Sequence, residues 1–505
     1  VDPLGQPSDQ VLRDVSLNAR LQSGLANPLD EAIIAAADVD LSGVEKIDEV
    51  PYDFARKRLS VVVHEGRDGA GSTTMIVKGA LESVLAACTQ VETEAGAVPL
   101  DDGQHAAIEK RYAEWSEQGF RVLGVATKPV STTTAIYTRD DECELIFAGA
   151  LLFFDPPKPG VTEVLSDLAG MGVTVKIITG DNRLVAKHAA ESVGLPDGEV
   201  LTGSQIQALN DEALWHAVER ANLFAEVDPN QKERIILALK KTRHVVGYMG
   251  DGINDAPALH AADVGISVDT AVDVAKEAAE FVLLKQDLAV LREGIAEGRR
   301  TFGNTLKYAF MATSANFGNM FSVAGASLFL PFLPMLPKQI LLINFLTDLP
   351  EMTIAGDNVD RAWIERPQRW DIDFIRRFML IFGPLSSIFD YMTFGLLYLA
   401  LRASPAVFHT GWFVESVLSA TAVVFAVRTR LPFLRSRPSR AMLAVTAAVA
   451  VLTLALPYTP LGGILEFVPL PPSVLAAIFG IVVLYFASAE FTKRLFYRAE
   501  ARRNK

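Results

Sequence analysis

Cysteine is almost absent from the sequence, and the marks of several protein classes are missing with it. Cys88 and Cys143 are the only two cysteines among 505 residues, too few for a disulfide framework. Lys and Arg number 47 against 60 Asp and Glu, and the net charge of −13 argues against a nucleic-acid partner. No G-x-x-x-x-G-K-[ST] string occurs, which disfavours a P-loop enzyme. A hydrophobic content of 50% excludes a disordered or collagen-like chain.

The first ten residues also lack familiar features. The sequence starts at Val1 rather than at an initiator Met, and residues 1–10 do not show the charged-then-apolar pattern of a signal peptide. We therefore expect the chain to be a piece of a longer protein.

Long apolar runs are confined to the last 200 residues. About 20 apolar residues cross the ~30 Å hydrocarbon core of a bilayer, and six stretches beyond Thr301 are predicted to do so. The second is short and polar, but an even number of spans leaves the Arg-rich loops and the basic C-terminal tail together on the cytoplasmic side. The six predicted spans are residues 308–330, 339–355, 374–400, 412–427, 441–456 and 473–489.

The first 300 residues have the pattern of an α/β protein in two parts. Residues 1–144 contain short strand-like runs, whereas from Leu145 onward a strand, an acidic loop and a helix follow one another repeatedly. Near-continuous apolar runs are typical of parallel strands covered on both faces. They predict such strands at residues 145–154, 173–178, 245–249 and 264–268.

Two of these predicted strands end in acidic turns that contain glycine. In open α/β sheets ligands bind at the carboxyl ends of strands, and glycine there lets backbone N–H groups approach a phosphate. Two aspartates four residues apart at a helix start suit Mg²⁺, and a lysine on the intervening helix 231–240 would stabilise phosphoryl oxygens. The simpler alternative is that these residues only cap helices. Capping is a good explanation for one such turn, but a poor one for two turns together with the lysine. The residues concerned are Thr179, Gly180, Asp181 and Asn182, then Gly250, Asp251, Gly252, Ile253, Asn254 and Asp255, with Lys232 between them.

With these residues the sequence resembles the P-type ion-pumping ATPases. The likeness rests on Thr179-Gly180-Asp181, Lys232 and the highly specific string from Gly250 to Pro257, and it spans nearly the whole chain. It implies a nucleotide-binding α+β domain at 1–144, a haloacid-dehalogenase-like phosphorylation domain at 145–300, and an all-α membrane domain of six helices at 301–505. It also implies catalytic roles for Thr179, Gly180, Asp181, Lys232, Asn254 and Asp255, and a catalytic Mg²⁺ held by Asp251 and Asp255.

The first part carries further strings similar to that family. Phe54 precedes Arg56-Lys57-Arg58, and Lys78-Gly79-Ala80 and Arg121 follow. The resemblance implies that Phe54 stacks on adenine, that Lys78 and Gly79 line the ATP pocket, and that Arg121 contacts the phosphates. Residues 155–158, Asp-Pro-Pro-Lys, are similar to the hinge between the two cytoplasmic domains.

One string of the family is missing. P-type ATPases form an aspartyl-phosphate on the Asp of D-K-T-G-T, which the sequence does not contain. We expect it upstream of Val1, together with the actuator domain and the first four membrane helices. Without this nucleophile the chain alone is expected to bind ATP but not to turn it over.

Polar residues within the predicted spans indicate an ion site. Asn344, Thr347 and Asp348 share one face of a helix, and an ionisable group inside a membrane is functional by default. The family's cation site is similar, so Asn316, Asn319, Asn344, Thr347, Asp348 and Glu415 are implied as its ligands. Asp390 is either a further acid of this kind or a hydrogen bond between helices.

The strings at 357–360, 383–390 and 411–415 are most similar to bacterial magnesium-transporting P-type ATPases. A sparse site of one or two carboxylates with amide oxygens is compatible with Mg²⁺. The resemblance implies a multi-pass plasma-membrane protein with a cytoplasmic C-terminus.

Four alternatives stay open. The ion is a proton or Ca²⁺ in two of them. The third is a non-catalytic, nucleotide-sensing membrane subunit. The fourth is a membrane-tethered phosphatase with Asp155 as its nucleophile.

Overall fold

The computed structural model describes residues 1–24, 28–37, 39–53, 56–67, 70–131, 136–196 and 198–503, and these form two compact units. The first unit comprises residues 1–166 and 174–288, and the second comprises 167–173 and 289–505. The division between the two units falls after Leu288, where the long helix α12 (Leu288–Ala326) begins. The domain boundary expected at residue 300 stays a prediction.

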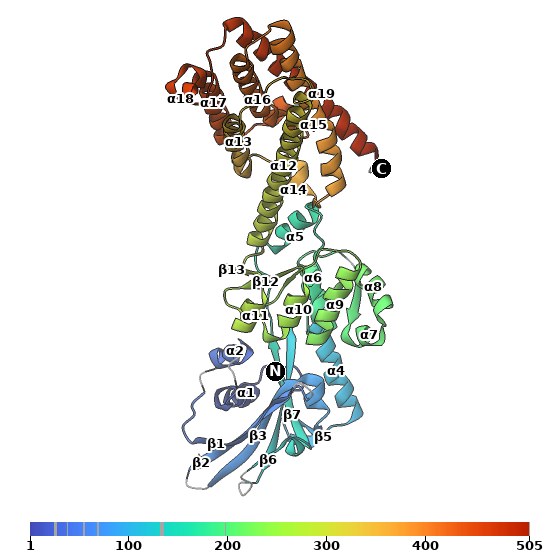
Figure 1. Ribbon diagram of the computed structural model, residues 1–505. Helices are drawn as coiled ribbons and strands as arrows, with labels where there is room; N and C mark the ends of the chain where they lie inside the picture. Colours follow the sequence, from blue (N-terminus) through green and yellow to red (C-terminus); the bar gives the residue numbers. More distant parts are fainter. Residues whose placement is uncertain are drawn as a thin grey trace. The chain divides into compact units, whose positions relative to one another are not determined.

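A mainly antiparallel sheet of seven strands, in the order β1-β2-β3-β6-β7-β4-β5, forms the core of the first 153 residues. Figure 1 shows α1 lying along this sheet, and its apolar side packs Val11 and Val15 against Val125 and Ala148. The elements are α1 (Asp9–Leu21), α2 (Pro28–Ala36), β1 (Val44–Asp53), β2 (Arg58–Arg67), β3 (Ala70–Ala80), α3 (Leu81–Leu85), β4 (Cys88–Thr93), β5 (Gly96–Pro99), α4 (Asp102–Glu117), β6 (Arg121–Val130), η1 (Arg139–Asp141) and β7 (Leu145–Phe153).

The prediction that residues 145–154 begin the parallel sheet of the second part is wrong. β7 pairs antiparallel with β6, from Arg121 opposite Phe153 to Thr127 opposite Ile146. Its faces are both covered, since Phe147 and Ala148 belong to different hydrophobic clusters. A strand buried on two sides reads as a continuous apolar run whichever direction its neighbours take. The boundary predicted at residue 145 therefore falls inside the first sheet.

Two parallel sheets of three strands each follow, ordered β8-β10-β9 and β11-β12-β13. They share one hydrophobic cluster, to which Ile178 and Phe224 contribute from the first sheet and Tyr248 and Val268 from the second. The strand predicted at 264–268 is confirmed, whereas those at 173–178 and 245–249 shorten to β8 and β11. The elements are α5 (Val161–Gly170), β8 (Ile177–Ile178), α6 (Arg183–Ser192), β9 (Glu199–Thr202), α7 (Gly203–Ala208), α8 (Asp211–Arg220), β10 (Ala221–Ala225), α9 (Pro229–Lys241), β11 (Gly247–Met249), η2 (Ile253–Asp255), α10 (Ala256–Ala261), β12 (Val264–Val268), α11 (Asp273–Ala278) and β13 (Phe281–Leu283).

Each sheet has an edge strand that pairs on one side only within the described ranges. β8 pairs with β10, and β11 pairs with β12, both in parallel. Met249 of β11 is an apolar side chain with 36% exposure, and Val245, two residues before the strand, is 77% exposed.

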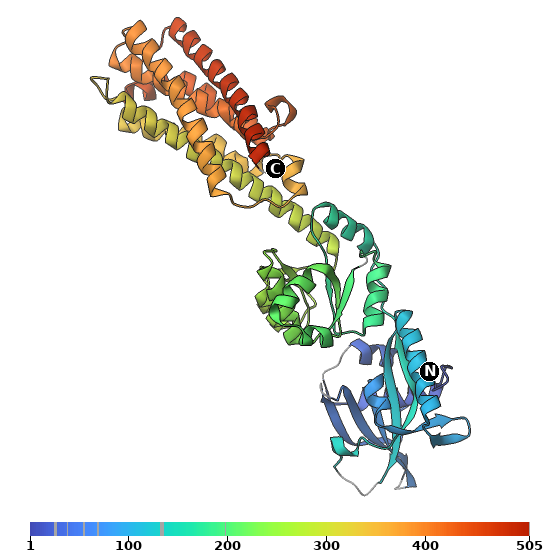
Figure 2. The same cartoon turned by 90° about the vertical axis from the view of Figure 1, so that its right-hand side faces the viewer.

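The second unit is a bundle of helices, drawn from yellow to red in Figure 2. A buried Asp357 accepts hydrogen bonds from Lys307 Nζ at 3.1 Å, Arg428 Nη1 at 2.8 Å and the Ser439 backbone N–H at 2.9 Å. Its elements after α12 are α13 (Pro337–Met352), η3 (Thr353–Gly356), α14 (Arg361–Glu365), α15 (Ile372–Phe394), the π-helical turn η4 (Gly395–Ala400), α16 (Pro405–Val427), η5 (Phe433–Arg435), α17 (Arg440–Ala455), η6 (Leu456–Tyr458), α18 (Pro460–Ile464) and α19 (Pro472–Arg503).

Four of the six expected membrane spans are long and apolar enough to cross a bilayer. They are the helical segments Ile372–Ala400, Pro405–Val427, Arg440–Tyr458 and Pro472–Arg503. α13 has 16 residues, or about 24 Å at 1.5 Å per residue, which is shorter than a ~30 Å hydrocarbon core. α12 and α13 nevertheless contribute Ala326 and Leu346 to the cluster that contains Phe394 and Phe413. The count of six stays a prediction.

Candidate functional site

Asp255 is the centre of a hydrogen-bonded group at the end of β11. Its Oδ1 accepts a hydrogen bond from Lys232 Nζ at 2.7 Å and one from the Tyr248 hydroxyl at 2.7 Å. Its Oδ2 accepts the Gly252 backbone N–H at 3.1 Å. The structure thus brings Lys232 on α9 to the glycine loop, as the sequence pattern predicts.

The two charges of this group are held in a mainly buried place. Asp255 is 7% exposed. Burial by itself would raise the pKa of Asp255, but the hydrogen bonds from Lys232 and Tyr248 hold that pKa below its usual value. Burial, with the hydrogen bond to Asp255, raises the pKa of Tyr248. The carboxylate therefore stays ionised and fixes the position of the lysine ammonium.

Tyr248 was missed by sequence reasoning because it lies inside a predicted strand. The strand period places it on the buried side, between the exposed Gly247 and Met249 of β11. A tyrosine hydroxyl that becomes buried needs a hydrogen-bond partner, and this requirement was the available signal.

Gly250 is required by the close approach of this loop to Asp255. A Cβ atom on Gly250 would lie 2.5 Å from the Asp255 Cβ and 2.8 Å from its Cγ. At Gly252 the nearest atom to such a Cβ is Asp255 Oδ2, at an ordinary 3.4 Å. Packing against Asp255 therefore requires glycine at position 250, but not at position 252.

The loop after β8 is held by its backbone and by Thr179. The Thr179 N–H donates to the Phe224 carbonyl at 2.9 Å, and Val227 N–H donates to the Thr179 carbonyl at 3.1 Å. The Thr179 hydroxyl lies 3.0 Å from Asp181 Oδ2 and accepts the Asp181 N–H at 3.1 Å. Gly180 is exposed beside them. The loop thus presents a hydroxyl, a carboxylate and an open glycine at the carboxyl end of a parallel strand.

Asp251 and Asn254 complete the second loop, and both are exposed. The Asp251 carboxylate has no hydrogen bond within the described ranges, whereas both oxygens of Asp255 are engaged. A free carboxylate beside an exposed amide is a hard-oxygen donor set of the kind that Mg²⁺ prefers. The fit for a metal ion is therefore better at Asp251 than at Asp255.

Of the residues expected to line the nucleotide pocket, Lys78 and Gly79 lie on β3. Lys78 is buried on β3 and makes an ion pair with the buried Asp30 of α2. Burial lowers the pKa of Lys78, and Asp30 opposes this shift. A Cβ on Gly79 would lie 2.4 Å from the Lys57 carbonyl oxygen, so glycine is needed there too. Phe54 lies outside the described residues.

Arg121 makes its ion pair with Asp181 of the loop after β8. Two predicted site residues that are 60 residues apart in the sequence are thereby brought together. Arg56 and Arg58, which follow Phe54 in the sequence, both make ion pairs with Glu142, whose side chain is fully buried. These two arginines therefore stabilise the sheet. Sequence reasoning missed both Glu142 and Asp30, because their partners are distant in the sequence. The partners of Glu142 lie 82 or more residues away, and the partner of Asp30 lies 48 residues away.

The expected ion-site residues fall into an open group and a closed group. Asn344 and Asp348 are exposed on α13, Asn316 is exposed on α12, and Asn319 is half-buried. Thr347 donates its hydroxyl to the Ile343 carbonyl of its own helix at 3.0 Å.

Glu415 belongs to the closed group. It is 1% exposed, and its Oε2 is buried without a hydrogen-bond partner among the described residues. Asp390 accepts hydrogen bonds from Ser322 Oγ at 2.6 Å and from Trp412 Nε1 at 2.8 Å. Asp390 thus forms hydrogen bonds between helices, as one of the two interpretations of this residue predicts.

The phosphatase alternative loses its structural basis. Its proposed nucleophile Asp155 follows β7, which belongs to the antiparallel sheet and not to a parallel strand next to the two loops. Asp155 is exposed and hydrogen-bonds to no described residue.

Comparison with known proteins agrees with this geometry. Residues 28–160 match the family described as P-type ATPase, cytoplasmic domain N, and residues 332–495 match cation transporting ATPase, C-terminus. Two relatives named magnesium-transporting ATPase, P-type 1, are 46% identical in Salmonella typhimurium strain 14028s and 45% identical in Escherichia coli K12, each over 98% of this chain and 56% of the relative. A calcium-transporting ATPase of Bacillus subtilis is 29% identical over 85% of this chain and 49% of its own length.

The chain spans about half the length of the curated relatives it matches. The matched region includes the two glycine loops, Lys232 and the apolar helices. The chain belongs to the P-type cation-transporting ATPases.

Proposed function

We propose that this chain supplies the ATP-binding, phosphoryl-transfer and ion-site residues of an ATP-driven Mg²⁺ transporter of the plasma membrane. The observation that carries the proposal is the group around Asp255, which fixes the Lys232 ammonium at the carboxyl end of a parallel strand. The resemblance to pumps named as magnesium transporters favours Mg²⁺ over Ca²⁺, since the calcium relative is less similar.

In this proposal Lys232 stabilises the charge that develops on the transferred phosphoryl group, and Asp255 keeps the ammonium in place. The Thr179 hydroxyl and the Gly180 backbone bind phosphoryl oxygens, with Asp181 and Asn254 beside them. Asp251 would hold a catalytic Mg²⁺, which neutralises phosphate charge when bound. Lys78, Gly79, Arg121 and Phe54 would form the ATP pocket.

The phosphorylated aspartate would come from upstream polypeptide. β8 and β11 are parallel strands with a free side, and each ends at one of the two loops. A strand added parallel to these edges would end beside Thr179 and Lys232. This arrangement supports transfer of a phosphoryl group to an aspartate on such a strand.

The cation would bind at the polar face of α12 and α13, through Asn316, Asn319, Asn344, Thr347 and Asp348, with Glu415 nearby. Six membrane helices, a surrounding lipid bilayer and a cytoplasmic C-terminus complete the proposal. Nucleic acid plays no part in it.

The experiment compares the 505-residue chain with the same chain extended upstream to the length of its relatives. We expect calorimetry to show ATP binding to both, and labelled ATP to leave an acid-stable phosphoenzyme only on the extended form. In that form Asp348→Asn should abolish Mg²⁺-stimulated ATPase activity and growth rescue of a magnesium-uptake-deficient bacterium, with ATP affinity unchanged within a few-fold.

Three results would contradict the proposal. Stable label on the 505-residue chain would require another nucleophile. Full growth rescue by Asp348→Asn would remove this residue from the ion path. ATPase activity that follows pH or Ca²⁺, but not Mg²⁺ above the catalytic requirement, would favour a proton or calcium pump.

A further inference from the structure

A cavity of about 620 Å³ lies in the first unit, apart from the residues assigned to ATP and to phosphoryl transfer. Its walls are α1, the chain start, strands of the seven-stranded sheet, the β4–β5 hairpin and α4. Thr74 and Ile76 of β3 line it, whereas Lys78, the next residue on that side of the strand, does not. Its volume is in the range of small-molecule sites, which is about 300–1,000 Å³.

The side chains around this cavity carry an excess of negative charge. Five carboxylates line it against two guanidinium groups. Arg13 is used by Glu65, to which it donates two hydrogen bonds of 2.8 and 2.9 Å, and Arg111 donates to the Pro3 carbonyl at 2.7 Å. The remaining carboxylates, without a basic side chain bonded to them among the described residues, are Asp2, Asp14, Glu92 and Glu94.

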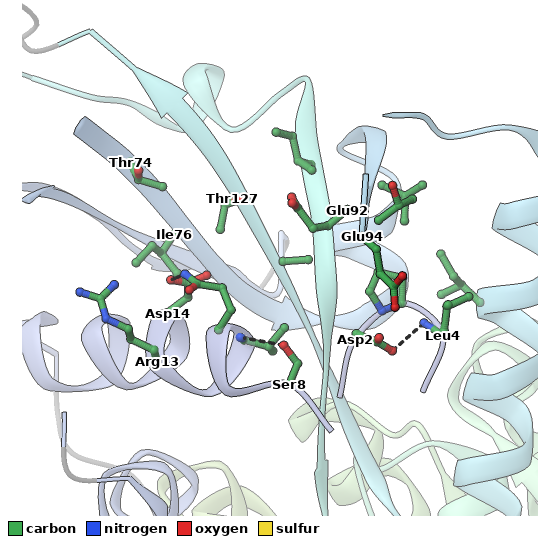
Figure 3. A pocket seen from close by; sticks show the side chains of 18 of the residues that line it. Asp2, Leu4, Ser8, Arg13, Asp14, Thr74, Ile76, Glu92, Glu94 and Thr127 are labelled. Atoms are coloured by element: carbon green, nitrogen blue, oxygen red, sulfur yellow. Dashed lines mark hydrogen bonds between the residues drawn. The ribbon is translucent and has the colours of Figure 1, made fainter. Parts of the chain in front are cut away.

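Asp14 is the carboxylate that most needs a cation. It is 7% exposed, and its Oδ1 accepts one hydrogen bond, from Gln10 Nε2 at 2.9 Å. Its Oδ2 accepts none from the described residues. Figure 3 shows Asp14 on α1 directed toward the strands of Ile76 and Thr127, with Glu92 and Glu94 across the cavity.

Burial raises the pKa of Asp14 to about 6, and Glu65 and Glu92 add to this rise against the opposing charge of Arg13. A buried carboxylate of this kind gains when a positive group enters the cavity.

The floor of the cavity is apolar, and this distinguishes the kind of cation. Ile76, Ile146 and Ala148 line it from β3 and β7, on the face of the sheet that α1 covers. A hydrated metal ion makes no use of such a surface, whereas a chain of methylene groups gains roughly 0.8 kcal/mol for each CH₂ that it buries. Ammonium groups at intervals along the chain would meet carboxylates on opposite walls.

We propose that this cavity binds a linear aliphatic polyamine, with one ammonium group at Asp14 and another at Glu92 and Glu94. The methylene segments lie on the floor formed by Ile76, Ile146 and Ala148. The site is independent of the proposed ATP pocket and of ion transport.

The test is calorimetric titration of the full 505-residue chain in detergent with spermidine, at pH 7.5 and in physiological salt with Mg²⁺ present. We expect saturable binding that weakens at least tenfold in the double variant Asp14→Asn, Glu92→Gln. The matched control is Glu109→Gln on the exposed side of α4, outside the cavity, which should change the affinity less than twofold. Retained ATP binding in each variant shows that the first unit is folded.

A series of ligands separates the floor from the charges. Affinity should rise from 1,3-diaminopropane to putrescine to cadaverine, which carry the same two ammonium groups and differ only in the number of methylene groups. Absence of saturable binding would overturn the proposal, and so would equal affinity in the double variant. Equal weakening by Glu109→Gln would mean general attraction to an acidic surface. Displacement by millimolar Mg²⁺, with no dependence on methylene number, would assign the cavity to a hydrated divalent ion instead.

Discussion

Replacement of Gly250 by alanine should disconnect Lys232 from the loop that it serves. The new Cβ would lie 2.5 Å from the Asp255 Cβ, and ordinary contact begins near 3.4 Å, so Asp255 must withdraw by about 0.9 Å. Hydrogen bonds of 2.7 Å to Lys232 and Tyr248 would then stretch to about 3.6 Å, which is no longer a hydrogen bond. With one charge-assisted and one ordinary bond weakened in a buried place, we expect a local loss of about 2–4 kcal/mol.

The loss is measured by hydrogen–deuterium exchange of the amides in η2 and α10. At 1.4 kcal/mol per factor of ten, exchange through local opening should become roughly 30- to 1,000-fold faster. Gly252→Ala is the matched control, because its Cβ meets Asp255 Oδ2 at 3.4 Å and displaces nothing. In the extended form that becomes phosphorylated, Gly250→Ala should slow phosphoenzyme formation. Equal protection in the two alanine variants would refute the reasoning.

Three further predictions concern buried charges. Asp14→Asn should stabilise the chain, because burial raises the pKa of this carboxyl from 3.8 to about 6, and ionisation of the folded protein therefore costs free energy as pH rises between these values. Denaturant unfolding should show that the variant's gain in free energy of unfolding is about 2 kcal/mol larger at pH 7.5 than at pH 4.5. A gain that does not depend on pH would contradict this prediction. Asp357→Ala leaves two buried cations and should cost about 3–5 kcal/mol in thermal unfolding, against under about 1 kcal/mol for Asp373→Ala, whose ion pair is exposed. Lys78→Ala should lose both stability and ATP affinity in calorimetry, and adding Asp30→Ala should restore the stability alone; recovery of ATP binding would exclude Lys78 from the pocket.

The site was predictable where its chemistry depends on neighbours in the sequence. Thr179 and Gly250 follow apolar strands directly, so their position at strand ends could be read from residue order. Lys232 was singled out because it opens the predicted helix between the two loops, and the structure places its ammonium 2.7 Å from Asp255 Oδ1. Tyr248 was not found, since an alternating strand residue gives no sign of which partner its hydroxyl meets.

The fold was predictable to the level of strand and helix, but not always of sheet. The run that became β7 has the composition of a parallel strand, and its pairings, antiparallel with β6 and parallel with β4, assign it to the first sheet. In the sequence Glu142 cannot be told from an ordinary surface acid, because its partners Arg56 and Arg58 lie 84 or more residues away. Contacts between distant segments depend on loop closure and packing that local periodicity does not encode.

The free edges of β8 and β11 also affect how such a polypeptide behaves before its assembly is complete. An edge strand with an exposed apolar side chain, such as Met249 of β11, and with the exposed Val245 just before it, is a template for pairing with another chain. Two such edges in one molecule allow head-to-tail growth of aggregates rather than simple dimers. Recombinant production of this segment therefore benefits from covering these edges, by co-expression with a complementary strand or by charged substitutions at Val245 and Met249.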